Sequence, residues 1–119
     1  MISRIWHGWT KREDADRYEK LLWSEVLPGI HRIRGYTGAF LMRRDAPDNE
    51  VEFVTITQFT DFHAVKAFAG EDYERAVIAP GAGQLLTHYD ERSAHYETLL
   101  TPADVRAMAA RMSGRNRVI

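Results

Sequence analysis

The segment from Val51 to Phe59 carries apolar side chains on both of its faces, and this feature restricts the possible folds more than any other. Side chains of a strand point alternately to opposite faces, so Val51, Phe53 and Phe59 share one face. Val54 and Ile56 lie on the other. An antiparallel sheet with one face in water alternates cleanly between apolar and polar residues. The sequence therefore predicts a sheet that is covered on both faces.

The predicted elements follow the order strand, helix, strand, strand, helix, strand, with a further helix at the C-terminal end. The first helix is expected to begin at a capping box formed by Thr10 and Glu13 and to be interrupted at Pro28, which has no amide hydrogen. This order is typical of an α+β ferredoxin-like fold with both helices on one face of the sheet. The predicted strands are 1–9, 36–44, 51–59 and 92–100, the helices 10–35, 61–70 and 101–114, and residues 82–89 have helical spacing.

One chain has no spare element large enough to cover the second face of the sheet, except its last helix. We divide the chain into a domain of residues 1–100 and a C-terminal helix with a basic tail, residues 101–119. Thr101 is expected to cap this helix and Gly114 to end it. A second copy of the same sheet is the economical cover, so we predict a homodimer with the two sheets face to face. The alternative is that the C-terminal helix covers this face within one chain.

Composition narrows the class of protein. The chain has 119 residues, a formal net charge of −1 and no cysteine. A near-neutral charge removes the main reason to expect a nucleic-acid partner. No apolar stretch approaches the length that spans a bilayer, so no membrane partner is expected. The lack of cysteine excludes disulfides and thiolate metal sites and fits a cytoplasmic protein.

Several short blocks resemble the antibiotic biosynthesis monooxygenase family. The blocks are residues 2–10, 51–55, 67–74 and 95–97. The resemblance covers about residues 1 to 100 and implies a dimeric α+β barrel with a pocket between sheet and helices in each protomer. It also implies two kinds of activity, since the family includes haem-degrading enzymes and oxygenases that act on aromatic substrates without a bound cofactor.

The residues that the haem-degrading branch uses are not found in this chain. That branch has an Asn on the first strand, a Trp on the helix after the third strand and a His about ten residues further on. Approximate matching places Ile5, Phe68 and a residue near Ile78 at these positions, and Ile cannot supply a ligand to haem iron. We therefore expect no haem degradation, no cofactor and no metal site.

Oxygenation without a cofactor needs a base or a cationic hydrogen-bond donor beside an apolar box. We select His7 and Tyr73 as candidate catalytic residues and note Arg4 as a possible cation. Gly8 follows His7 and could let a ligand approach the backbone. His95, in the predicted last strand, could instead face the dimer interface. The candidate pocket-lining residues are Trp6, Phe68 and His88.

The expected substrate is a small aromatic or enolisable molecule. The competing hypothesis is a non-catalytic dimeric module that binds a small molecule or serves in a stress response, in which the histidines only pack. An enzyme predicts that a His and a Tyr or Arg converge on a closed apolar cavity. A packing module predicts no cavity or a purely apolar one.

Overall fold

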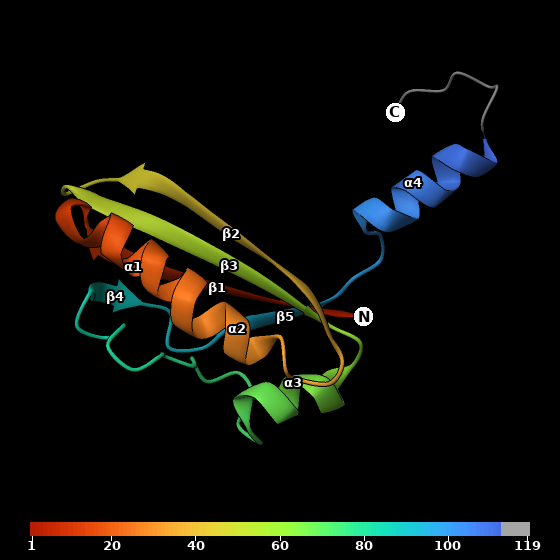
Figure 1. The fold of residues 1–119 in the computed structure, drawn as a ribbon, viewed down its shortest axis with the longest axis horizontal. Helices are drawn as coiled ribbons and strands as arrows, with labels where there is room; N and C mark the ends of the chain where they lie inside the picture. The colour runs from red at the N-terminus through yellow and green to blue at the C-terminus, as the bar shows by residue number, and fades with distance from the viewer. Residues whose placement is uncertain (113–119) are drawn as a thin grey trace.

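A five-stranded antiparallel sheet forms the centre of the protein, whose computed structural model describes residues 1–112 (Figure 1). The sheet order is β2-β3-β1-β4, and β5 also pairs with β1. The two last strands pair with opposite ends of β1, so together they occupy the fourth position of a ferredoxin-like sheet. The predicted α+β ferredoxin-like fold is confirmed. The strands are β1 (Ile2–Lys11), β2 (Tyr36–Ala46), β3 (Glu50–Phe59), β4 (Leu86–Tyr89) and β5 (Ala94–Glu97).

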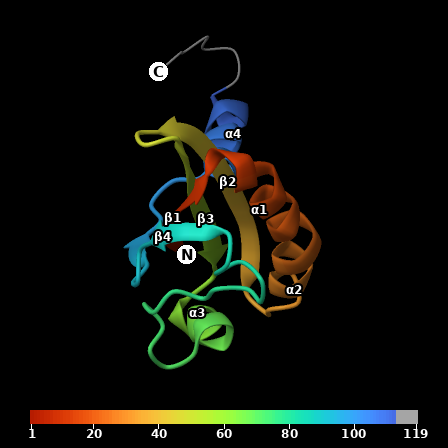
Figure 2. The ribbon, with the colours of Figure 1, turned by 90° about the vertical axis from the view of Figure 1, so that its left-hand side faces the viewer.

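Helices cover one face of this sheet only. A helical run made of α1 (Ala15–Leu21), a π-helical turn (Leu22–Val26) and α2 (Leu27–Ile30) lies along that face, and within residues 1–112 no helix covers the opposite face (Figure 2). The wide turn precedes Pro28, whose ring cannot accommodate the carbonyl of the residue four positions earlier. The predicted interruption of this helix is therefore present, as a π-helical turn.

The predicted capping box at Thr10 is wrong. Strand β1 continues through Thr10, which is fully buried and pairs with Val51. Its hydroxyl donates to the carbonyl of Lys11 over 2.9 Å and so does not cap a helix. The chain leaves the strand through a short 3-10 turn (Arg12–Asp14), and α1 starts only at Ala15. Pairing with the long third strand thus prevails over the local capping pattern.

The helix after the third strand is α3 (Phe62–Ala69), as predicted. The Asp61 carboxylate accepts from the backbone N–H of Ala64 over 2.9 Å at its start. Gly70 ends it with a φ of 88°, a conformation that favours glycine. The helical spacing predicted over residues 82–89 is wrong, because turns lead through this segment into strand β4.

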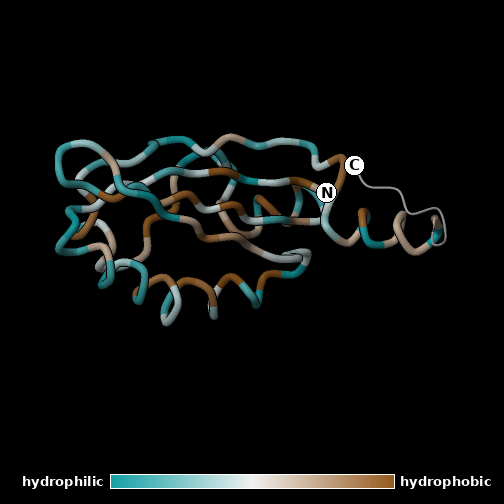
Figure 3. The backbone as a smooth tube through the Cα atoms, turned by 90° about the horizontal axis from the view of Figure 1, so that it is seen from above, coloured by the Kyte–Doolittle hydropathy of each residue, from teal (hydrophilic) through white to brown (hydrophobic). Residues whose placement is uncertain are grey.

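Alternation along the strands separates an inner face, toward α1 and α2, from an outer face. Val51, Phe53 and Phe59 point inward and are at most 1% exposed. Val54 and Ile56 point outward and are partly exposed. Apolar residues therefore recur along the strands as well as along the helical run, as the hydropathy colours of Figure 3 indicate.

The C-terminal helix α4 (Pro102–Arg111) extends away from the sheet and from α1 to α3 (Figure 1). Its N-terminus has the predicted cap: Thr101 and Asp104 form a reciprocal capping box. No residue of α4 is buried. Gly114, Arg115 and Arg117, which we expected to end the helix and form a basic tail, lie outside the described residues. None of the helices within residues 1–112 is long and apolar enough to cross a membrane.

Candidate functional site

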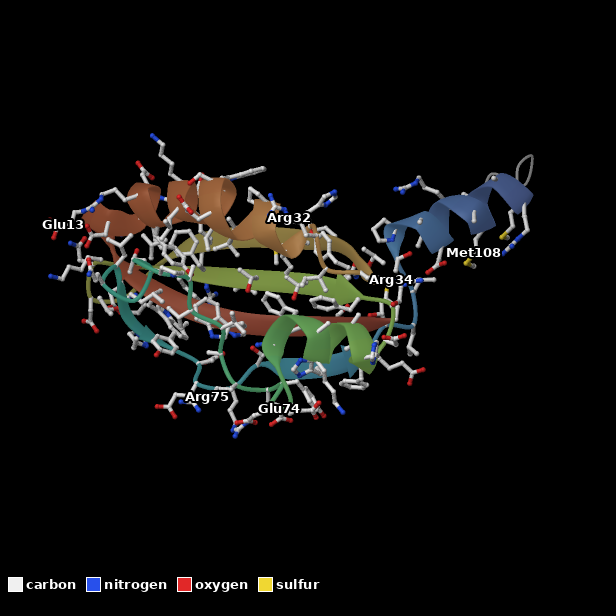
Figure 4. The ribbon with its side chains drawn as sticks, turned by 60° about the horizontal axis from the view of Figure 1, so that its bottom comes forward. Glu13, Arg32, Arg34, Glu74, Arg75 and Met108 are labelled. Atoms are coloured by element: carbon white, nitrogen blue, oxygen red, sulfur yellow. The ribbon has the colours of Figure 1, made fainter. Side chains whose placement is uncertain are left out.

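A cavity of about 790 Å³ lies between the inner face of the sheet and the run from α1 to α2. Tyr18 and Leu22 line it from the helical run, and Ile78 and Ala82 line it from the turns before β4. Arg32, which follows α2 and is labelled in Figure 4, lies at its exposed rim. The volume and apolar lining are typical of small-molecule sites.

Trp6 and Phe68 both line this cavity. Trp6 points inward from β1, is 8% exposed, and its indole N–H donates to the backbone carbonyl of Asp90 over 2.7 Å. Phe68 comes from α3 and packs against Phe59, with ring centroids 5.8 Å apart. Both aromatic residues thus contribute apolar surface to the wall of the cavity.

Arg4 is the charged group at the floor of the cavity. It points inward from near the start of β1 and is only 4% exposed. Its guanidinium carbon lies 5.5 Å from the centroid of the Phe68 ring, a cation–π arrangement. Burial lowers the pKa of the Arg4 guanidinium from its usual range to about 10. Arg4 is thus a cation kept in an apolar environment, where a charge interacts more strongly than in water.

The hydrogen bonds of Arg4 fix its position without neutralising it. Nη1 donates to the backbone carbonyl of Tyr73, and Nη2 donates to that of Arg75 over 2.9 Å. Nη1 also lies 3.1 Å from Nε2 of His95, which must accept, since arginine only donates. Among residues 1–112 no carboxylate forms an ion pair with Arg4. A buried cation without a carboxylate partner is unusual, because buried charges are normally paired.

Tyr73 and His95 lie behind Arg4 and outside the cavity lining. Their rings meet edge to face with centroids 5.1 Å apart, and Phe62 packs against both. His95 pairs with Arg4 across β5 and β1, so it points inward and not to the outer face, which the sequence left as an alternative. Tyr73 therefore reaches the site through its backbone carbonyl, which holds Arg4, and the cavity wall does not include its ring.

His7 and His88 lie on the outer face of the sheet. His7 directly follows Trp6 in a strand, so it points to the opposite side. Its Nδ1 lies 2.9 Å from the Asp90 carboxylate. His88 stacks on Trp9 at 4.3 Å and binds Glu50 through Nε2 at 3.1 Å. Neither histidine lines the cavity, so the geometry does not give His7 access to a ligand there or make His88 part of its wall.

Gly8 serves a different purpose from the one expected. A Cβ atom at this position would lie 2.5 Å from Cη2 of Trp6. The missing side chain therefore makes room for the indole ring of Trp6, and no ligand is needed to explain the glycine.

The environment of His95 should make the stability of the protein depend on pH. Burial and, to a lesser extent, the charge of Arg4 lower the pKa of His95 below its usual 6.5. Its share of stability is present above about pH 6.5 and is lost as the pH falls, because the unfolded chain takes up the proton first. His95→Gln keeps an acceptor for Arg4 and removes the titration. We expect this variant to lose less unfolding free energy than the wild type between about pH 7 and pH 5 in urea titrations. Parallel curves would contradict this assignment.

Sequence reasoning missed Ser93. This residue is 4% exposed and lines the cavity, and its Oγ has no hydrogen-bond partner among residues 1–112. It lies in the break between β4 and β5. No sequence pattern marks the break between these two strands. The sequence instead predicted helical spacing over residues 82–89 and one strand from residue 92.

Comparison with known proteins identifies the fold. No family model matches the sequence, and no curated protein is similar to it. Among solved structures, a putative antibiotic biosynthesis monooxygenase from Bacillus cereus matches with a TM-score of 0.59 at 11% identity, covering 84% of this chain and 94% of its own. SnoaB, a cofactor-independent oxygenase from Streptomyces nogalater, matches with 0.55 at 18% identity, covering 85% and 96%. The haem degrader MhuD from Mycobacterium tuberculosis, solved with two haems bound, matches with 0.55 at 16%, covering 85% and 98%.

These likenesses define an antibiotic biosynthesis monooxygenase-like fold, as the resemblance implied. At these identities the agreement concerns the fold, and the residues of the cavity have to be considered by themselves. The matches cover nearly all of each neighbour but leave about one sixth of this chain unmatched.

Proposed function

We propose that this protein is a homodimer that takes a small aromatic or enolisable molecule into the cavity and oxygenates it without a bound cofactor. The observation that carries the proposal is the buried, carboxylate-free Arg4 on the floor of an apolar cavity. The fold shared with a cofactor-independent oxygenase supports it. Trp6 and Phe68 are the proposed walls that hold an aromatic ring.

Arg4 can supply the electrostatic part of such a reaction. A cation in a water-poor cavity favours the anion of a phenol or enol, and this anion is electron-rich enough to give one electron to dioxygen. This transfer leaves a substrate radical and superoxide. The two radicals combine through a new carbon–oxygen bond, and uptake of a proton gives a hydroperoxide. Loss of water then leaves a carbonyl group in the product. One oxygen atom enters the product and the other leaves as water, so the substrate supplies all the electrons.

Haem degradation is not part of the proposal. His31 is the only histidine in the described part of the cavity lining, and it is exposed. A histidine that binds haem iron normally donates its other ring N–H to an acceptor, and this hydrogen bond orients the ring. The only hydrogen bond of His31 in the described chain is made by its backbone.

The proposed second copy would cover the outer face of the sheet. On this face Phe40 is 46% exposed, Met42 48% and Tyr96 57%, and Ile5 and Ile56 are partly exposed. A wide apolar face of this kind typically marks an interaction site. A two-fold axis would bring two such faces together, as in other sheet-on-sheet packings.

We also propose that α4 belongs to this assembly, as an addition to the domain of residues 1–100. Val105, Met108 and Met112 recur every three or four residues, and each is 39 or 40% exposed. An isolated helix of ten residues is marginal in water, so it needs an apolar surface to pack on. Figure 4 shows Met108 well away from the sheet of its own chain.

A ligand screen followed by oxygen uptake tests the proposed function. A tricyclic, enolisable aromatic ketone such as anthrone, present at 100 times its dissociation constant, should stabilise the protein by about 2.7 kcal/mol in thermal unfolding. An oxygen electrode should then record uptake with the wild type. We expect Arg4→Lys to lower the uptake at least about tenfold, because it loses the planar fork of donors, and His7→Gln to retain it.

The two competing hypotheses give opposite results in this experiment. Stabilisation of the protein by a ligand without oxygen uptake would identify a non-catalytic binding module. The absence of His7 and of the Tyr73 ring from the cavity lining favours this competing hypothesis. Uptake that survives Arg4→Lys but is lost in His7→Gln would contradict the site proposed at Arg4 and return the reaction to the outer face.

A further inference from the structure

Arg4 has hydrogen-bonding capacity that the protein leaves unused. Its guanidinium carries five N–H donors. Three of them serve the carbonyls of Tyr73 and Arg75 and the ring of His95. Nε–H and one N–H of Nη2 have no partner within residues 1–112. Nε and Nη2 stand side by side on the guanidinium, and this edge matches the two oxygens of a carboxylate.

Ser93 is a second unpaired group at the same place. It stands two residues before His95, the neighbour of Arg4 across β1 and β5, so Ser93 points to the same inner face. Its hydroxyl is buried without a partner, although buried polar atoms are nearly always hydrogen-bonded. Thr57, opposite Arg4 in β3, also lines the cavity. The polar floor therefore combines a cation and hydroxyl groups with no acid among them.

We propose that Arg4 and Ser93 form a seat for the anionic head group of an organic acid, with the apolar body of the ligand lying between Trp6 and Phe68. The proposal rests on the cavity being the ligand site, as the proposed function has it, and adds the charge and orientation of the ligand. The head group accepts from the free edge of Arg4 and from the Ser93 hydroxyl. A carboxylate and the oxygen of an enolate or phenolate share this chemistry.

The physical reason is the uncompensated charge. A buried cation without a counter-ion carries a desolvation cost that its bonds to neutral carbonyls only partly offset. An anion in the cavity would supply the missing charge and satisfy three donors at once. A neutral ligand of the same shape would fill the cavity but leave the cation unpaired. The lowered pKa of Arg4 has the same origin, since desolvation acts on it without an opposing acid.

Two ligands of nearly equal shape test the proposal without any variant. Naphthoate carries a carboxylate, and naphthamide carries a neutral amide on the same ring system. In titration calorimetry at neutral pH we expect the wild type to bind naphthoate about tenfold or more tightly than naphthamide, as charged hydrogen bonds in a buried site require. Equal affinities, or a preference for naphthamide, would overturn the proposal.

Three variants locate the anion. Arg4→Lys keeps the charge but loses the fork, and Ser93→Ala removes only the hydroxyl, so both should reduce the preference for naphthoate several-fold. Arg32→Gln is the matched control, because Arg32 lines the same cavity but is exposed at its rim. The preference should survive it. If Arg32→Gln loses the preference for naphthoate over naphthamide, or if the other two variants keep it unchanged, the proposed anion site at Arg4 and Ser93 is wrong.

A third ligand separates the two sources of the anion. Naphthol is neutral in neutral solution, and its ionised form absorbs at longer wavelength. If naphthol also binds tightly, with the spectrum of naphtholate, the seat accepts phenols and enols as well, and if only naphthoate binds tightly, the seat is for carboxylic acids. Either result supports an anion at Arg4. If naphthoate or naphtholate binds but no ligand drives oxygen uptake, the seat stands and only the proposed oxygenation fails.

Discussion

Phe53→Asp is expected to unfold the protein, whereas the same acid at the next position, Val54→Asp, should leave the fold intact and prevent the proposed dimer. The two residues are neighbours in β3 and point to opposite faces of the sheet. Phe53 is fully buried on the inner face, and Val54 is partly exposed near the centre of the outer face. The pair of variants therefore separates the core from the proposed interface.

The expected loss at Phe53 exceeds what a domain of this size can tolerate. Its ring packs edge to face on Tyr18 with centroids 4.8 Å apart. Removing a buried Phe costs about 3–5 kcal/mol, and an unpaired buried carboxylate adds several more, against a total stability of about 5–15 kcal/mol. Arg43 lies 5.6 Å from the ring centroid but already binds Asp16 and Glu19, so it is a poor partner for the new acid.

At Val54 the carboxylate stays in water as long as the chain is a monomer. Its cost to the monomer fold should be about 1 kcal/mol or less, the range of strand preferences. In a two-fold dimer two such acids would be buried near each other, which costs several kcal/mol. Circular dichroism should record native secondary structure for Val54→Asp and its loss for Phe53→Asp, and light scattering should give a monomer for Val54→Asp beside a dimeric wild type. A Val54→Asp protein that remains a dimer would exclude this face as the interface.

The fold could be predicted from the sequence because alternation along a strand is a strong signal. The apolar residues on both sides of β3 predicted a sheet with two faces to cover, and the structure places them on an inner and an outer face. Helix α3 was equally accessible, because its first and last residues are set locally, by the Asp61 cap and by Gly70. Both signals depend only on neighbouring residues.

Elements that depend on distant contacts could not be predicted. Thr10 and Glu13 have the spacing of a capping box, but β1 extends through Thr10 because β3 is long enough to pair with it. Leu85, Leu86 and Tyr89 have helical spacing, yet they belong to a turn and a short strand. A short apolar run fits a helix or a strand equally well, and here pairing with β1 decides.

The site illustrates the same limit. Alternation alone places Trp6 and His7 on opposite faces, so both could not have lined one cavity, and this signal was available in the sequence. It also places Arg4 on the side of Trp6. The absence of a carboxylate around Arg4, by contrast, depends on β5 and α3, which lie far away in sequence. The polar floor of the cavity is therefore a property of the tertiary structure.

Gly8→Ala should close the cavity to ligands. The new Cβ would lie 2.5 Å from Cη2 and 2.9 Å from Cζ3 of the Trp6 indole, and 3.0 Å from Cδ2 of Leu86. Trp6 and Leu86 both line the cavity, so we expect the indole to relieve the contact by turning into that space. We expect naphthoate or anthrone binding to weaken at least about tenfold, with a loss of about 1–3 kcal/mol of stability from overpacking.

Gly38→Ala is the matched control for this variant. Gly38 is a strand glycine in β2, and a Cβ there would meet no atom within 4 Å, so its ligand affinity should stay unchanged. The double variant Trp6→Phe with Gly8→Ala completes the test, because phenylalanine lacks the outer indole atoms that the new Cβ would contact. If the indole blocks the cavity, Gly8→Ala should weaken binding much less in the Trp6→Phe background than in the wild type, a coupling that a double-mutant cycle measures directly. Equal losses in both backgrounds would mean that Gly8 acts on the cavity through the backbone, and that the indole of Trp6 is not the group that keeps it open.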